Sequence, residues 1–149
     1  MPLPILLLPA ILQAIAMIAD EGVFHRRRGL DRWERLGHPF DALCVAGCYA
    51  WLLSNSPRDE HALSIYIAAA AASCVLITKD EFVHARVCKP LEHWLHAVLF
   101  VLHPIVFLAF GVLWWNGDSA PWLIGQLVLT VACALSQAVY WSKPCKTAR

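Results

Sequence analysis

The sequence predicts an all-α integral membrane protein with about five transmembrane helices. Three observations lead to this fold class: composition, the length of the apolar runs and the placement of basic residues. Of the 149 residues, 59% are hydrophobic and only 15% are charged. A soluble domain is typically about 45–50% apolar and about 25% charged. We therefore expect a single transmembrane domain over residues 1–149.

Five apolar runs follow one another along the chain, and short polar or basic links separate them. An α-helix needs roughly 20 residues to cross hydrocarbon about 30 Å thick, and fewer when its ends snorkel. The second run is the shortest, and the first, which has no basic stretch ahead of it, is expected to be a retained anchor. The expected spans are residues 3–19, 40–53, 62–78, 91–115 and 121–141.

The basic residues predict how these spans are oriented, because cytoplasmic links of membrane proteins are enriched in Lys and Arg. Of the 12 basic residues, 11 lie after the first, third and fifth spans, and only Arg58 lies elsewhere. The prediction is a bacterial inner-membrane protein with its N-terminus outside and its C-terminus in the cytoplasm. The last three basic residues of this set are Lys143, Lys146 and Arg149.

A degenerate repeat appears at the cytoplasmic ends of the first four spans. An Asp-Glu pair ends an apolar run, a histidine follows about one turn later, and E-x-x-x-H opens the next run. We interpret residues 3–54 and 62–115 as two parallel-repeat helix hairpins forming a four-helix bundle, with 121–141 as a fifth helix. The two copies consist of Asp20, Glu21, His25, Glu34 and His38, and of Asp80, Glu81, His84, Glu92 and His96.

This pattern predicts a metal centre at one membrane edge. Residues four apart share a helix face, so acids and histidines from four helix ends should converge. Carboxylate and imidazole groups on facing helices are typical ligands of two divalent metal ions. Iron is favoured, with manganese or zinc as alternatives. The expected ligands are Glu21, His25, Glu34, His38, Glu81, His84, Glu92 and His96.

Further polar residues are expected near this centre. The fifth span carries polar side chains three and four residues apart, which places them on one helix face. That face should turn away from lipid, either to pack against other helices or to line a substrate cavity. The cavity-lining candidates are Gln126, Thr130, Gln137 and Tyr140. Possible additional ligands, or residues beside the ligands, are Asp20, Asp41, Asp80, His93 and His103.

Simpler explanations exist for single residues. Glu34 occupies the position that completes a capping box with Asp31. Glu92 follows Pro90 at a helix start, where acids are favoured, and the Asp-Glu pairs lie near interfacial arginines. None of these roles requires a histidine at a similar spacing in both copies, and ionisable groups at membrane depth usually mark function.

The ligand set resembles in kind that of soluble di-iron carboxylate bundles, which use Glu from two helices and Glu-x-x-His from two others. Here the second motif is E-x-x-x-H, and extra histidines are present. Membrane desaturases and hydroxylases carry histidine boxes, of which only the spacing of His93 and His96 is reminiscent. The resemblance is one of chemistry and does not extend to family membership.

Two functions are consistent with this pattern of residues. The first is an integral membrane di-metal oxidoreductase, with a di-iron centre favoured, acting on a lipid-like or hydrophobic substrate at the cytoplasmic interface. It would have membrane lipids around it and an electron donor as partner. The alternative is a non-catalytic membrane protein that binds, senses or transports metal. Neither nucleic acid binding nor a disulfide framework is expected, because there is no basic binding surface and no C-x-x-C pair.

Overall fold

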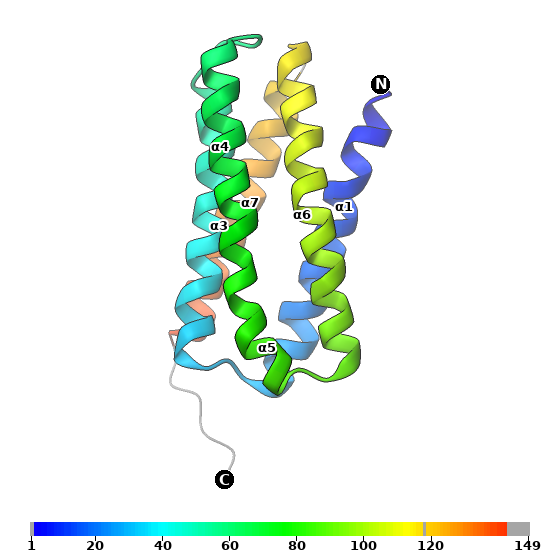
Figure 1. Ribbon diagram of the computed structural model, residues 1–149, viewed down its shortest axis with the longest axis vertical. Helices are drawn as coiled ribbons and strands as arrows, with labels where there is room; N and C mark the ends of the chain where they lie inside the picture. The colour runs from blue at the N-terminus through cyan, green and yellow to red at the C-terminus, as the bar shows by residue number, and fades with distance from the viewer. Residues whose placement is uncertain (1, 118, 143–149) are drawn as a thin grey trace.

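A computed structural model describes residues 2–117 and 119–142, and this part of the chain is helical and has no strands. Cys145 and the basic residues after the last helix lie outside the described residues. Its five long helices run up and down along the long axis of the molecule (Figure 1). They are α1 (Leu3–Ala19), α3 (Arg32–Leu53), α4 (Glu60–Leu76), α6 (Pro90–Asn116) and α7 (Ala120–Trp141).

Short helical elements gather at one end of the molecule, which we call the acidic end (lower end of Figure 1). There α1 and α4 finish, and α3 and α6 begin, so the polar stretches of both sequence copies are brought to one end. These elements are the π-helix η1 (Asp20–His25), α2 (Arg26–Arg28), the 3-10 helix η2 (Ile77–Asp80) and α5 (Glu81–Val87).

Four helical stretches are long and apolar enough to cross a membrane. They include α1, α4, α6 and α7, so four of the five expected spans meet this measure in length and composition. Helix α3 has 22 residues but begins with the charged run Arg32 to Arg35 and also contains Asp41. These charged residues lower the mean hydropathy of α3. Two of them, Glu34 and Asp41, are buried and do not face lipid. The stretches are Leu3–Arg28, Glu60–Val87, Pro90–Asn116 and Ala120–Trp141.

The long helices pack in a definite neighbour order. Helix α3 packs most extensively against α7, and α1 against α6, while α4 contacts both α3 and α6. Helices α1 and α7 are not among the pairs that pack extensively. The order α1, α6, α4, α3, α7 therefore leaves a seam between the first helix and the last.

An apolar core in the half away from the acidic end holds α3, α4 and α6 together. Tyr49, Phe110 and Trp114 are buried there, and the Tyr66 hydroxyl donates to the Phe107 carbonyl at 2.7 Å. A Cβ on Gly111 would lie 3.1 Å from the Tyr66 ring, so α4 and α6 approach closely because this residue is glycine. Many large apolar side chains of α1 and α7 are exposed, as expected for a lipid-facing surface.

Candidate metal centre

The two copies of the acid–histidine pattern differ by one residue, and helix η1 absorbs the difference. His25 follows Asp20 by five positions, whereas His84 follows Asp80 by four. A π-helix pairs residues five apart, so η1 brings the His25 Nε2 within 3.4 Å of the Asp20 Oδ2. Local π-helical turns are often found at functional sites. In both copies it is the aspartate of the Asp-Glu pair that is buried.

The first potential ligand group joins η1 to the start of α6. Its four possible ligand atoms all lie within 4.8 Å of one another, and every residue in it is buried. The closest contact joins the His96 Nε2 to the Asp20 Oδ1 at 3.0 Å. The members of this group, which we call group A, are Asp20, His25, Glu92 and His96.

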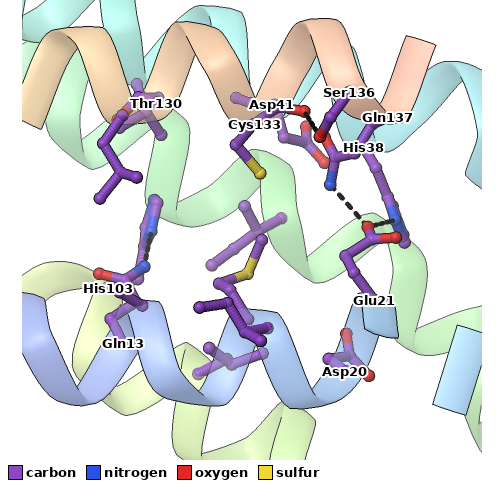
Figure 2. A pocket seen from close by; sticks show the side chains of 18 of the residues that line it. Gln13, Asp20, Glu21, His38, Asp41, His103, Thr130, Cys133, Ser136 and Gln137 are labelled. Carbon is purple, nitrogen blue, oxygen red and sulfur yellow. Dashed lines mark hydrogen bonds and ion pairs between the residues drawn. The ribbon is translucent and has the colours of Figure 1, made fainter. Parts of the chain in front are cut away.

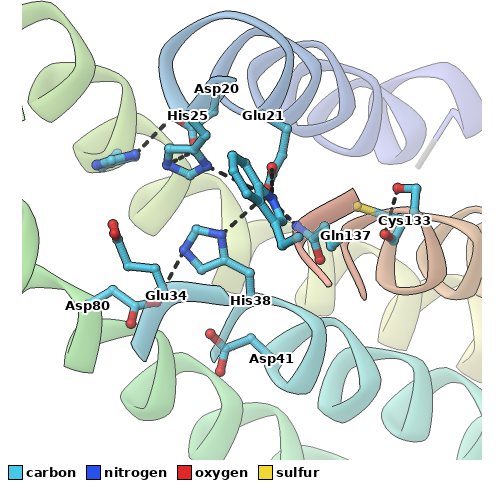
Figure 3. Close-up of polar contacts among 12 residues, drawn as sticks. Asp20, Glu21, His25, Glu34, His38, Asp41, Asp80, Cys133 and Gln137 are labelled. Carbon is cyan, nitrogen blue, oxygen red and sulfur yellow. Dashed lines mark hydrogen bonds and ion pairs between the residues drawn. The ribbon is translucent and has the colours of Figure 1, made fainter. Parts of the chain in front are cut away.

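A second potential ligand group joins the start of α3 to α5. The His84 Nε2 lies 3.4 Å from the Glu34 Oε1, and the His38 Nε2 lies 3.8 Å from the Asp80 Oδ2. Asp80 lies beside this group, whereas Asp20 is a member of the first. Each aspartate contacts a histidine of the other sequence copy: Asp20 contacts His96, and Asp80 contacts His38. Figure 3 shows Glu34, His38 and Asp80 facing His25. The members of this group, group B, are His25, Glu34, His38 and His84.

The two groups are adjacent and share His25. The ring of His84 stacks on that of His96 with centroids 3.9 Å apart, and the rings of His25 and His38 are 4.9 Å apart. Two metal ions in natural dinuclear sites stand about 3.5–4 Å apart. Because groups A and B share His25, two ions bound there would be close neighbours. Cys88, which forms a third overlapping group with His84 and His96, adds a thiol at the edge.

Arg28 ties the two groups together. Its guanidinium donates to both oxygens of Glu34, at 2.9 and 2.7 Å, and its Nε donates to Glu92 at 3.0 Å. Glu34 also forms the capping box expected with Asp31, so one residue starts α3 and faces the centre. Burial raises the pKa of Glu34, but the His84 ring 3.4 Å away and the hydrogen bonds from Arg28 outweigh it and hold that pKa well below its usual range.

Several buried polar atoms at the centre have no hydrogen-bond partner among the described residues. They include both ring nitrogens of His25, both ring nitrogens of His84 and the Asp80 Oδ1. Three of these nitrogens have a carboxylate oxygen 3.4–3.6 Å away, but none forms a well-aligned hydrogen bond with it. Buried polar atoms in native proteins are nearly always hydrogen-bonded, so orphan atoms at one point call for an explanation. Imidazole nitrogens and a carboxylate oxygen are metal ligands, and the donor set fits two divalent cations.

The charge balance agrees with that fit. Lys79 pairs with Asp41 and also with Asp80, so its charge offsets that of Asp41 and leaves the charges of five carboxylates against the guanidinium of Arg28. With neutral histidines the balance is four negative charges, which two divalent cations would neutralise. The five carboxylates belong to Asp20, Glu21, Glu34, Asp80 and Glu92.

Two of the expected ligands lie outside both groups. Glu81 is bonded to His93 at 2.6 Å, and their side chains are 39% and 44% exposed, so this pair sits at the surface. Glu21 accepts a hydrogen bond from the Gln137 amide at 2.6 Å and lies 3.2 Å from the His38 Nδ1. Glu21 thus orients a histidine of group B and connects α7 to it, as Figure 3 shows.

Three residues near the centre were not anticipated from the sequence: Arg28, Lys79 and Cys88. Arg28 is one of several clustered arginines that we interpreted as a topology signal, and nothing local distinguishes it. Lys79 was counted in the same way, and Cys88 was assigned no role. Only the tertiary structure shows which basic side chains turn inward.

A cavity of about 760 Å³ adjoins the centre. Asp20, His38 and His96 line its end at the centre, and His103 lines it further away (Figure 2). The polar stripe of α7 faces this cavity, with Thr130 buried. The stripe residues that line it are Gln126, Thr130, Cys133, Gln137 and Tyr140.

Comparison of the chain with protein families, with curated proteins and with solved structures yields no match. The geometry of the site is therefore what indicates its function.

Proposed function

We propose that this protein is an integral membrane di-metal oxidoreductase that acts on a hydrophobic substrate at the cytoplasmic interface. The observation that carries the proposal is the burial of His25 and His84 among carboxylates from both sequence copies, with ring nitrogens that make no well-formed hydrogen bond. The adjoining cavity favours an enzyme over a storage or structural site, because a closed metal site needs no cavity beside it.

The ligand assignment follows the two groups. One ion would be held by Asp20, Glu92 and His96, and the other by Glu34, His38 and His84, with Asp80 beside it. His25 stands between the two. Iron is favoured for its fit to oxygen and nitrogen donors, with manganese or zinc as alternatives. Bound metal would supply Lewis-acid chemistry and, with iron or manganese, electron transfer.

The chain's own residues have separate tasks in this proposal. Arg28 holds Glu34 and Glu92 in position through three hydrogen bonds. Glu21, itself held by Gln137, fixes the orientation of the His38 ring. Such outer hydrogen bonds commonly set ligand geometry and basicity in metal sites. The cavity admits apolar substrate and keeps bulk water from the centre.

The exchange of ligands between the copies supports the repeat hypothesis. Asp20 meets His96 and Asp80 meets His38, so each copy contributes to both groups. We propose that residues 3–54 and 62–115 are parallel-repeat hairpins that form a four-helix bundle, with α7 added beside α3. The basic links favour an orientation with the acidic end in the cytoplasm, where an electron donor could reach it.

Metal content tests the proposal directly. Protein purified after growth in metal-replete medium should contain close to two transition-metal ions per chain. His25→Ala and His84→Ala should each lower this number, whereas His61→Ala, at an exposed position of α4, should leave it unchanged. If the metal is iron, the absorption spectrum of the reduced protein should change on exposure to oxygen. Absence of stoichiometric metal would contradict a metal centre, and an unresponsive spectrum would contradict oxidoreductase activity towards oxygen.

A further inference from the structure

A second polar cluster lies in the cavity, away from the metal centre. The Gln13 amide lies 3.2 Å from the His103 Nδ1, and the Ser73 hydroxyl lies 3.1 Å from the His103 Nε2. His103 follows His96 by two turns of α6, which corresponds to about 10 Å along the helix. Figure 2 shows Gln13 and His103 together at one end of the cavity and Glu21 at the other.

This cluster lies near the middle of three membrane-spanning stretches. Gln13 belongs to Leu3–Arg28, Ser73 to Glu60–Val87 and His103 to Pro90–Asn116, in each case near the centre. Polar groups at this depth are costly and usually functional. Bonding among the three residues removes part of the cost but not all of it, because Gln13 has more hydrogen-bonding groups than His103 engages.

The contacts leave the Gln13 amide able to bind a ligand. When its nitrogen donates to the His103 Nδ1, the imidazole proton lies on Nε2 and points to Ser73. The Gln13 carbonyl oxygen and its second N–H then have no partner among the described side chains, while Gln13 lines the cavity. A ligand hydroxyl or carbonyl oxygen matches these groups.

The cavity between the two polar ends is apolar and opens toward lipid. Ala14, Ala42 and Leu99 line its middle. Ile18 on α1 and Val139 on α7 line it while being 71% and 63% exposed. These two residues flank the seam between α1 and α7. The bond between Glu21 and Gln137 closes this seam at its acidic end, so a membrane-dissolved molecule would enter on the membrane side of that bond.

We propose that Gln13, positioned by His103 and Ser73, anchors an oxygen atom of a lipid-soluble ligand whose other end reaches the metal centre. The ligand class is an apolar molecule with a hydroxyl or carbonyl group about 10 Å from the carbon or group presented to the metals. The action of the metals on this ligand rests on the proposed function, but its binding does not. A cluster that merely packs α1, α4 and α6 together would not discriminate between ligands.

Photolabelling in lipid nanodiscs tests the anchor without requiring turnover. The full-length protein is exposed to a diazirine-bearing 16-carbon alcohol or to the matching diazirine hydrocarbon, and labelled residues are mapped by mass spectrometry. We expect the alcohol to label cavity residues more strongly than the hydrocarbon. Loss of one such hydrogen bond should lower labelling by the alcohol roughly three- to tenfold in Gln13→Met, which keeps side-chain length. Ser73→Ala, which acts through His103, should give a smaller decrease, and Ser64→Ala, at an exposed position of the same helix, none.

Competition with unlabelled compounds identifies the source of the oxygen. Displacement by hexadecanol indicates an alkyl hydroxyl, and displacement by a short-tailed benzoquinone indicates a quinone carbonyl. Equal labelling by alcohol and hydrocarbon, an unchanged signal in Gln13→Met, or displacement by neither compound would each overturn the anchor. Metal content is measured on the same samples, so failure of the anchor and failure of the metal centre are distinguished.

Discussion

At the scale of single residues, Glu34 shows that a structural role and a site role coincide in one side chain. It closes the capping box with Asp31 and also receives two hydrogen bonds from Arg28. Glu92 shares that arginine but has no box partner, since Lys89 caps α6 without a side-chain bond. The capping explanation and the ligand explanation of Glu34 are therefore compatible.

Glu34→Gln and Glu92→Gln should each cause a large loss of metal, of similar size. Each change removes a negative charge that faces the cations and Arg28, leaving that guanidinium less compensated. Glu60→Gln, at an exposed position in the first turn of α4, should have little effect. Metal per chain measures the result. Loss of metal in Glu92→Gln alone would show that Glu34 acts only as a helix cap. It would refute the hypothesis of a duplicated site.

The protonation of His38, which precedes the apolar part of α3, predicts a pH dependence. Burial lowers the pKa of His38, but hydrogen bonding and charge from Glu21 outweigh it and raise that pKa above 6.5. A metal must displace this proton, so metal affinity should fall as pH decreases through the raised pKa, beginning above 6.5. In the Glu21→Gln variant, the midpoint of this loss of metal affinity should move to lower pH. Equilibrium dialysis between about pH 8 and 5.5 tests this, and occupancy that does not change with pH would contradict it.

At the scale of elements, α3 combines a polar start with an apolar end, and two of its glycines differ in surroundings. A Cβ on Gly37 would lie 3.3 Å from the Cε and Nζ of Lys79, whereas one on Gly47 would meet nothing within 4 Å. Lys79 is held by Asp41 and Asp80, so it cannot move away without losing these contacts. The glycine at 37 therefore allows η2 to approach α3.

Gly47→Ala should stabilise the protein by up to about 1 kcal/mol, the usual gain of alanine over glycine in a helix. Gly37→Ala should forfeit this gain, because the new methyl group displaces Lys79 from its carboxylates. Thermal unfolding in one detergent compares the two variants on the same helix. Equal transition temperatures would show that Lys79 relaxes freely and that the close approach is unimportant.

At the scale of the whole molecule, the helix order leaves the α1–α7 seam beside the metal centre, and both lie toward the acidic end. The basic links predict that this end faces the cytoplasm. Cys88, between α5 and α6, reports on this end, since it is partly exposed. Ser56, between α3 and α4, is exposed at the opposite end.

In intact cells an impermeant thiol reagent should label a Ser56→Cys variant and miss Cys88. Permeabilised cells should show labelling of Cys88 as well, which controls for its accessibility. The physical reason is that translocation of a basic link is unfavourable, so the arginine-rich links remain inside. Efficient labelling of Cys88 from outside would reverse the orientation and place the centre on the other face.

Much of the helical architecture is predictable from the sequence because helix formation and membrane crossing depend on local composition. The apolar runs predicted all five long helices, although α3 begins well before its apolar part because the capping box at Asp31 starts it there. The gathering of His25, His38, His84 and His96 could also be expected from the sequence. Spans that alternate in direction bring the end of one and the start of the next to the same membrane edge. These features depend on lengths and spacings within the chain.

By itself, the sequence determined the helices, their ends and the gathering of acids and histidines at one edge. Only the tertiary structure decided which side chains of that edge meet. The π-helix η1 turns Asp20 inward, Glu81 remains at the surface with His93, and Arg28 alone of its cluster joins Glu34 to Glu92. The physical reason is that successive residues of a helix are rotated by about 100° around its axis. A shift of one residue therefore turns a side chain to a different face. Packing among distant helices then fixes one rotation of each helix, which could not be read from local spacing.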